Sequence, residues 1–183
     1  QRWRARSSAI LTGVGTVLAD DPTLTVRAFD IGRQPLRVVA DSRLRTPAAA
    51  RLLQQLGATL IVGADPGGER AEALRRAGAE VLCLPGPDGA VDLAALMTHL
   101  VGREVNELLV EAGAGLTGAL LGGGWVDELV VYLAPSLMGS HARGMADIPG
   151  LECLADRIAL EITDVRAVGT DWRIVAKVAK KEG

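Results

Sequence analysis

Aromatic side chains and cysteines are scarce in this chain of 183 residues. Trp, Tyr and Phe make up only 3% of the sequence, although 49% of it is hydrophobic, so aliphatic side chains must fill the core. The two cysteines, Cys83 and Cys153, form neither a CxxC motif nor a disulfide framework. We therefore expect two buried free thiols in a reducing cytoplasm.

Strong charge of one sign and long apolar runs are also missing. The formal net charge is −2 and there is no basic tail, which argues against a nucleic-acid partner. No apolar stretch approaches the roughly 20 residues that a membrane helix needs. The length suits one domain. No signal peptide is visible, and the chain begins at Gln1 without Met, so we expect it to be part of a longer protein.

Groups for metal binding or nucleophilic catalysis are sparse. His99 falls inside an expected helix without a second ligand at helical spacing, and His141 falls in an expected loop. A zinc site needs three or four convergent ligands, so we expect no metal. No serine lies in a GxSxG elbow, and neither cysteine has a recognisable catalytic partner.

Hydrophobic patterning predicts strands that alternate with helices for most of the chain, followed by two long strands. Alternation favours βαβ units, so we expect a mixed, mostly parallel sheet with helices on both faces and a C-terminal antiparallel hairpin. The expected strands are 9–11, 36–40, 59–62, 81–84, 108–110, 129–133, 159–168 and 172–178; the expected helices are 16–19, 48–56, 68–77 and 92–101, and 135–150 is a long loop.

The segment 108–121, LLVEAGAGLTGALL, is the clearest candidate for a binding site. An apolar strand ends at Glu111, and Gly113, Gly115 and Gly118 separate it from helical-looking residues. A strand, a glycine turn and a helix leave backbone N–H groups at a helix N-terminus, which favours an anion. Glycine lets a phosphate approach the backbone. We expect a phosphate cradle with Glu111 at its mouth.

The GxGxxG pattern alone is weak evidence for a dinucleotide. A Rossmann unit also needs an acidic residue about 20 positions on, at the end of the next strand. Here Asp127 and Glu128 precede the next expected strand, 129–133, and so lie at its wrong end. The alternative is that the glycines form a tight turn that binds nothing.

Arginines suitable for phosphate flank the first glycine region and follow the second strand. Arg4 and Arg27 lie on either side of the first region, and Ser42, Arg43 and Arg45 directly follow residues 36–40. Guanidinium forks match phosphate geometry, so the second group could hold the 2′-phosphate that separates NADP from NAD. The alternative for it is a solvated basic loop.

Five segments resemble the reductase domain of the bifunctional RibD proteins of riboflavin biosynthesis. The resemblance implies a dihydrofolate-reductase-like fold and NADPH-dependent reduction of 5-amino-6-(5-phosphoribosylamino)uracil to the ribitylamino product. The segments are AILTGVGTVLADDPTLTVR (9–27), QPLRVVADSRLRTP (34–47), LLVEAGAGLTGALL (108–121), VDELVVYLAPSLMGSHARG (126–144) and VGTDWRIVAKV (168–178).

The resemblance also implies a cofactor site. Thr16 and Asp20 would contact the nicotinamide side of NADPH, and Ser42 the adenosine side. Asp20 and Asp21 could instead be turn formers at a helix end. The residues expected around the cofactor diphosphate are Gly113, Ala114, Gly115, Leu116, Thr117, Gly118 and Ala119.

The substrate residues implied in the same way are Arg4, Leu24, Arg27 and Glu111, which would hold the phosphoribosyl compound. We expect the arginines to anchor its phosphate. Glu111 and Asp20 are the expected catalytic residues, orienting substrate and cofactor or assisting proton movement.

Two parts of the family pattern are missing before Gln1. They are an N-terminal strand with a short loop that touches ligands, and the zinc deaminase domain with its HAE and PCxxC patterns. We therefore expect residues 1–183 to form a single reductase domain that cannot deaminate. Three alternatives stay open: reduction of the 2,5-diamino-pyrimidinone analogue before deamination, a folate reductase, and a non-catalytic NADP-binding module.

The C-terminal strands suggest an assembly. Ile174, Ala176 and Val178 point to one face of the last strand, and an uncovered terminal ribbon would expose apolar side chains and backbone groups. We expect a homodimer formed largely through residues 159–178, since two-fold pairing is the commonest oligomer. The alternative is that these strands complete the sheet of the monomer.

Overall fold

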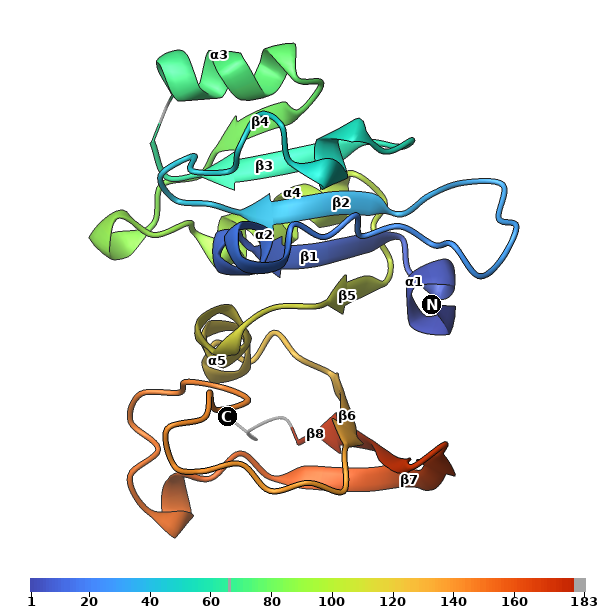
Figure 1. Ribbon diagram of the computed structural model, residues 1–183. Helices are drawn as coiled ribbons and strands as arrows, with labels where there is room; N and C mark the ends of the chain where they lie inside the picture. The colour runs from blue at the N-terminus through green and yellow to red at the C-terminus, as the bar shows by residue number, and fades with distance from the viewer. Residues whose placement is uncertain (66, 180–183) are drawn as a thin grey trace. The chain divides into compact units, whose positions relative to one another are not determined.

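The computed structural model describes residues 1–65 and 67–179 and divides the chain into two compact units, Gln1–Gly113 and Ala114–Gly183. Figure 1 shows a parallel sheet with helices in the first unit and a smaller antiparallel sheet in the second.

The first unit is built on a five-stranded parallel sheet. Its strand order is β4-β3-β2-β1-β5, so the first strand of the chain pairs with both the second and the fifth. All five segments are short, largely aliphatic runs, as expected for strands that are covered on both faces. They are β1 (Ala9–Gly13), β2 (Leu36–Ala40), β3 (Thr59–Gly63), β4 (Glu80–Cys83) and β5 (Leu108–Val110).

Helices cover both faces of this sheet. On one face Val39 and Ile61, which are register partners, pack in a cluster with Val17 of α2 and Leu74 of α3. The next residues along the strands point to the opposite face, and Figure 1 shows α4 behind the sheet and α2 in front. The helical segments are α1 (Arg2–Arg6), α2 (Val14–Asp20), η1 (Arg51–Gln54), α3 (Glu69–Arg76), η2 (Pro87–Gly89) and α4 (Leu93–Gly102).

The expected helix over 48–56 is wrong, because only the short 3₁₀ segment η1 forms there. The backbone is extended at Gln55, and the guanidinium of the fully buried Arg37 gathers the carbonyl oxygens of Gln55, Leu56 and Gly57 at 3.2, 2.8 and 2.6 Å. Burial lowers the pKa of Arg37. The hydrogen bonds from the Arg37 side chain on β2 therefore stabilise a non-helical backbone at residues 55–57, although the local sequence favours a helix.

The described part of the second unit contains one α-helix, one short 3₁₀ helix and a separate antiparallel sheet of order β6-β8-β7. The fold class is confirmed, but the C-terminal hairpin pairs with β6 and forms no part of the parallel sheet. The long loop is also confirmed, since 134–153 contains no helix or strand. The elements are α5 (Ala114–Gly122), β6 (Glu128–Leu133), η3 (Leu154–Asp156), β7 (Leu160–Val168) and β8 (Asp171–Val178).

One face of this antiparallel sheet is entirely apolar. Cross-strand partners point the same way, and the register pairs Val131 and Val165 with Ile174. Charged partners such as Arg166 and Arg173 fall on the other face. Several large side chains of the apolar face are more than 45% exposed, Ile162 most of all at 62%. We call this set the apolar face: Leu129, Val131, Leu133, Leu160, Ile162, Val165, Ala167, Trp172, Ile174, Ala176 and Val178.

Candidate functional site

Three strands of the parallel sheet end in residues that the sequence singled out. β1 runs directly into α2 at Gly13, β2 is followed by Asp41 and Ser42, and β5 is followed by Glu111. The carboxyl ends of parallel strands meet at one edge of a sheet, where ligands bind in α/β folds. The strand ends therefore place groups from separate parts of the sequence at one edge.

The predicted substrate residues Arg4 and Glu111 are bound to each other. Arg4 Nε donates to Glu111 Oε1 at 2.7 Å and Arg4 Nη2 donates to Glu111 Oε2 at 2.6 Å. Arg4 Nη1 donates to the carbonyl oxygen of Thr25 at 3.1 Å. The contact with Glu111 raises the pKa of the Arg4 guanidinium. This bidentate pair fixes the orientation of the carboxylate, which keeps 33% of its surface exposed.

Leu24 and Arg27 lie on the same irregular segment as Thr25. Leu24 is only 2% exposed and has φ of +49°, so it anchors the segment in the core and does not present its side chain to solvent. The side-chain amide of Gln34 accepts from Val26 N at 2.8 Å and donates to Val26 O at 3.1 Å, as a strand neighbour would. Arg27 is exposed, and its backbone N–H donates to Gln1 Oε1.

Helix α2 carries the residues predicted for the nicotinamide side of the cofactor. Thr16 and Asp20 are four residues apart and therefore share one face of the helix. Asp20 is exposed at the last helical position. Asp21, with φ of +41°, ends the helix, and its Oδ1 accepts from Arg51 N at 2.8 Å. The turn-forming role therefore belongs to Asp21, and the Asp20 carboxylate has no hydrogen bond to any of the described residues.

The segment after β2 contains a buried carboxylate that sequence reasoning missed. Asp41 is fully buried, and its Oδ2 accepts from the amide and hydroxyl of Thr46 at 2.6 and 2.8 Å. Ser42 is half-buried beside it, and Arg43 and Arg45 are exposed. The Asp41–Thr46 contact shapes the turn that presents them. An Asp with a Thr five residues on is the only sequence signal for it.

The glycine turn differs from its predicted form. Helix α5 already begins at Ala114, so Gly115 and Gly118 lie inside it. Gly113 and Gly115 are exposed, and a Cβ at either would meet nothing within 4 Å. At Gly118 a Cβ would lie 1.7 Å from the carbonyl oxygen of Asp147. The absence of a side chain leaves room for a ligand at the first two positions and permits backbone packing at the third.

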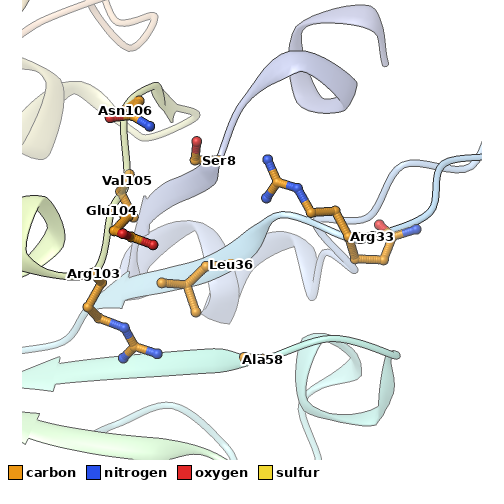
Figure 2. A pocket seen from close by; sticks show the side chains of 9 residues that line it. Ser8, Arg33, Leu36, Ala58, Arg103, Glu104, Val105 and Asn106 are labelled. Atoms are coloured by element: carbon orange, nitrogen blue, oxygen red, sulfur yellow. The ribbon is translucent and has the colours of Figure 1, made fainter.

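A hollow of about 430 Å³ lies at the opposite end of the parallel sheet. It is lined by residues that precede or open the strands, such as Ser8 before β1 and Leu36 in β2. Figure 2 shows Arg33 and Arg103 on opposite sides of Leu36. None of the predicted site residues lines it, so the candidate site does not coincide with this hollow.

The described residues contain no cluster of three or more His, Cys, Asp and Glu side chains able to hold a metal. His99 lies in α4, where its Nε2 is buried without a hydrogen-bond partner among them. Both cysteines are free, as expected. The expectation that both are buried is wrong, because Cys83 is half-buried and Cys153 is exposed, with its Sγ 3.0 Å from Asp156 Oδ2.

Comparison with known families assigns the chain to one of them. The RibD C-terminal domain family matches residues 1–174, and the chain belongs to it. The match spans both compact units.

Known relatives agree with this assignment. Riboflavin biosynthesis protein RibD of Escherichia coli is 43% identical over 184 residues, covering 93% of this chain and 49% of that protein. The 2,5-diamino-6-ribosylamino-4(3H)-pyrimidinone 5′-phosphate reductase of Methanothermobacter thermautotrophicus is 40% identical over 172 residues, covering 92% and 78%. Acinetobacter baumannii RibD superposes with a TM-score of 0.84 at 32% identity, covering 97% and 49%.

The chain therefore spans about half the length of the RibD proteins it matches. Within the described part of the chain, no helix is long and apolar enough to cross a membrane.

Proposed function

We propose that this chain is an NADPH-dependent reductase of riboflavin biosynthesis acting on 5-amino-6-(5-phosphoribosylamino)uracil. The observation that carries the proposal is the Arg4–Glu111 pair, which joins two substrate residues implied by the RibD resemblance although they are 107 positions apart. Both compact units together make one reductase domain, since the family match spans them. It works in the cytoplasm, where free cysteines stay reduced.

In this reaction Glu111 and Arg27 have different tasks. Arg4 neutralises Glu111 and aims its carboxylate, which accepts hydrogen bonds from the sugar hydroxyls or the amino group of the substrate. Arg27, exposed and without an ion pair among the described residues, supplies a guanidinium to the substrate phosphate. Leu24 positions the backbone between them. Asp20 orients the reacting groups or assists proton movement from the end of α2.

The residues of this chain fit a nicotinamide cofactor, which supplies the hydride in such a reduction. Thr16 and Asp20 would hold its nicotinamide side and Ser42 its adenosine side. The open space at Gly113 and Gly115, at the start of α5, fits the approach of a diphosphate to the helix N-terminus. Gly118 is excluded from that role, because the Asp147 backbone occupies its space.

The chemistry requires positioning more than an activated nucleophile. In the ring-opened, imine-like form of the sugar, a hydride adds to C1′, the π electrons of the C=N bond move to nitrogen, and nitrogen takes up a proton. The chain holds the phosphate with Arg27 and the sugar with Glu111, so that C1′ is fixed for transfer. This accounts for a site that is built from carboxylates and guanidiniums.

A second candidate substrate is the 2,5-diamino-pyrimidinone analogue. It is favoured by the 40% identity to the archaeal 2,5-diamino-6-ribosylamino-4(3H)-pyrimidinone 5′-phosphate reductase, of which this chain covers 78%. The two substrates differ in one ring substituent.

Loss of NADPH absorbance with each pyrimidine, and with dihydrofolate, separates the candidates. We expect turnover of the deaminated uracil, with kcat/KM about 100-fold lower for Glu111→Gln. A preference for the diamino compound would exchange the two substrate assignments, and turnover of dihydrofolate alone would identify a folate reductase. NADPH binding without turnover of any of them would leave a non-catalytic module.

The apolar face supports a homodimer through the C-terminal strands. It is formed by three adjacent strands, and such a patch marks a contact surface. Two copies related by a two-fold axis cover it at once. Ile162 and Glu161 are neighbours on opposite faces of β7, so Ile162→Arg should give monomers in light scattering at micromolar concentration while Glu161→Arg stays dimeric. A monomeric unmutated protein would contradict this assembly.

A further inference from the structure

A hollow of about 280 Å³ lies just beyond the carboxyl end of β2. Leu44, Ala73 and Leu74 contribute apolar surface to it, and the two arginines of its lining are Arg45 and Arg70. It therefore combines apolar surface with two guanidiniums in one small space. Its size suits part of a dinucleotide and not the whole, since pockets for complete ligands begin at about 300 Å³.

Arg70 comes from a different part of the chain than the arginines expected to bind phosphate. It lies in the first turn of α3, and its Nη1 donates to the carbonyl oxygen of Arg43 at 3.0 Å. This bond ties Arg70 to the turn after β2 and leaves other N–H groups of the fork for a ligand. Arg43 contributes its carbonyl to that bond, and its side chain is not part of the lining.

The positive charge of the hollow is not balanced by its own lining, which contains no carboxylate. Asp41 is close in sequence, but it is fully buried and does not line the hollow. Its Oδ2 accepts from the amide and hydroxyl of Thr46, and its Oδ1 has no hydrogen-bond partner among the described residues. Neither Arg45 nor Arg70 has an ion pair with any residue that the structure describes. Two guanidiniums beside apolar surface are suited to a dianionic phosphoryl group on a sugar that also carries a flat base.

We infer that Arg70, together with Arg45, recognises the 2′-phosphate of NADPH and makes the chain prefer NADPH to NADH. The inference rests on the proposed function for the identity of the cofactor, and it replaces Arg43 with Arg70 in the predicted set. The apolar surface takes the adenosine and the two guanidiniums take the phosphate.

Binding of adenosine 2′-monophosphate, measured by calorimetry against adenosine 5′-monophosphate, tests the inference without catalysis. Arg70→Ala should weaken binding of the 2′-phosphate about 10- to 100-fold, as expected for a charge-assisted contact, and should leave NADH affinity unchanged. Arg76→Ala, an exposed arginine on the same helix outside the lining, is the matched control and should bind as the unmutated protein does. Arg70→Lys should retain part of the preference.

The outcomes separate this inference from the proposed function. If Arg43→Ala abolishes the preference while Arg70→Ala does not, or if the unmutated protein does not distinguish the two adenosine phosphates, the inference is wrong even when the pyrimidine is reduced. If binding of the 2′-phosphate depends on Arg70 but no pyrimidine is reduced, the inference holds and the proposed function fails.

Discussion

The two compact units bury their apolar side chains very differently. In the unit 1–113 both faces of the sheet are covered, and Ile61 at its centre is completely buried. Among the described residues of the unit 114–183, the buried hydrophobic ones are Leu120, Leu121, Val175 and Ala176, while the apolar face leaves Ile162 62% exposed. The parallel sheet is covered on both faces, whereas the antiparallel sheet leaves much of its apolar face exposed.

This difference shows what each sheet type requires. Crossover helices between parallel strands necessarily lie against the sheet and cover it. A hairpin and a long loop supply no such cover, so an antiparallel sheet with one apolar face must obtain it from another surface. The first unit therefore covers its own sheet, whereas the second leaves several large side chains of the apolar face exposed.

The largest effect should come from the same substitution made in each sheet. Ile61→Ala leaves a cavity in a closed core and should lower the free energy of unfolding by about 2–5 kcal/mol. Ile162→Ala removes an exposed side chain and should cost less than about 1 kcal/mol in dilute protein, with a larger cost as concentration rises. Urea unfolding at two protein concentrations measures both, and equal costs in dilute solution would contradict the comparison.

Within α5, Gly118→Ala should destabilise where Gly115→Ala should not. The added Cβ at Gly118 meets the Asp147 backbone, and overpacking of this kind costs about 1–3 kcal/mol. The Cβ at Gly115 meets open space, and alanine favours a helix over glycine by up to about 1 kcal/mol. Thermal unfolding followed by circular dichroism should show a lower Tm only for Gly118→Ala. A lower Tm for both would place Gly115 in a packed contact as well.

The Arg4–Glu111 pair should contribute about 1 kcal/mol to the stability of the first unit. It is bidentate and partly buried, with side-chain exposures of 15% and 33%, which places it at the upper end for ion pairs near a surface. A double-mutant cycle with Arg4→Met and Glu111→Gln isolates the coupling. A coupling energy near zero would mean that the pair serves ligand binding alone.

The smallest effect concerns acid stability of the second unit. Hydrogen bonds from Arg166 and Arg173 lower the pKa of Asp164 from its ordinary 3.8 to about 2. Because the folded-state pKa is depressed, the contribution is complete above pH 4 and is lost as pH falls toward 2. The stability difference between the unmutated protein and Asp164→Asn should therefore shrink across that interval. It should also shrink in high salt, since Asp164 is only half-buried and Arg166 is exposed. A difference that does not change with pH would contradict the shift.

The strands of the first unit were predictable because each is a continuous aliphatic run. Residues 36–40 and 59–62 read as strands from their own composition, and burial on both faces removes any conflict with their environment. The absence of a helix over 48–56 could not be predicted from the local sequence. It depends on the guanidinium of Arg37, a residue of another segment, which donates to the carbonyl oxygens of Gln55 and Leu56. Nothing near position 50 encodes that contact.

The site was predictable in its residue types and only partly in its contacts. A strand ending in Glu111 and an arginine at position 4 were both visible, but their pairing depends on the fold. Gly118 matched a phosphate-loop pattern although its backbone serves packing against Asp147. Arg70 gave no signal, because a charged residue in an exposed helix has the same pattern whether or not it faces a hollow.

The strand order has a consequence for how the chain is made. β1 pairs with β5, so its second edge has no partner until residue 110 has left the ribosome. During the intervening synthesis, Ala9 to Leu11 form an open parallel edge of the growing sheet, the kind of edge that pairs with other chains. Nascent chains that stall before Leu108 consequently keep this edge open, and the three-residue strand β5 closes it.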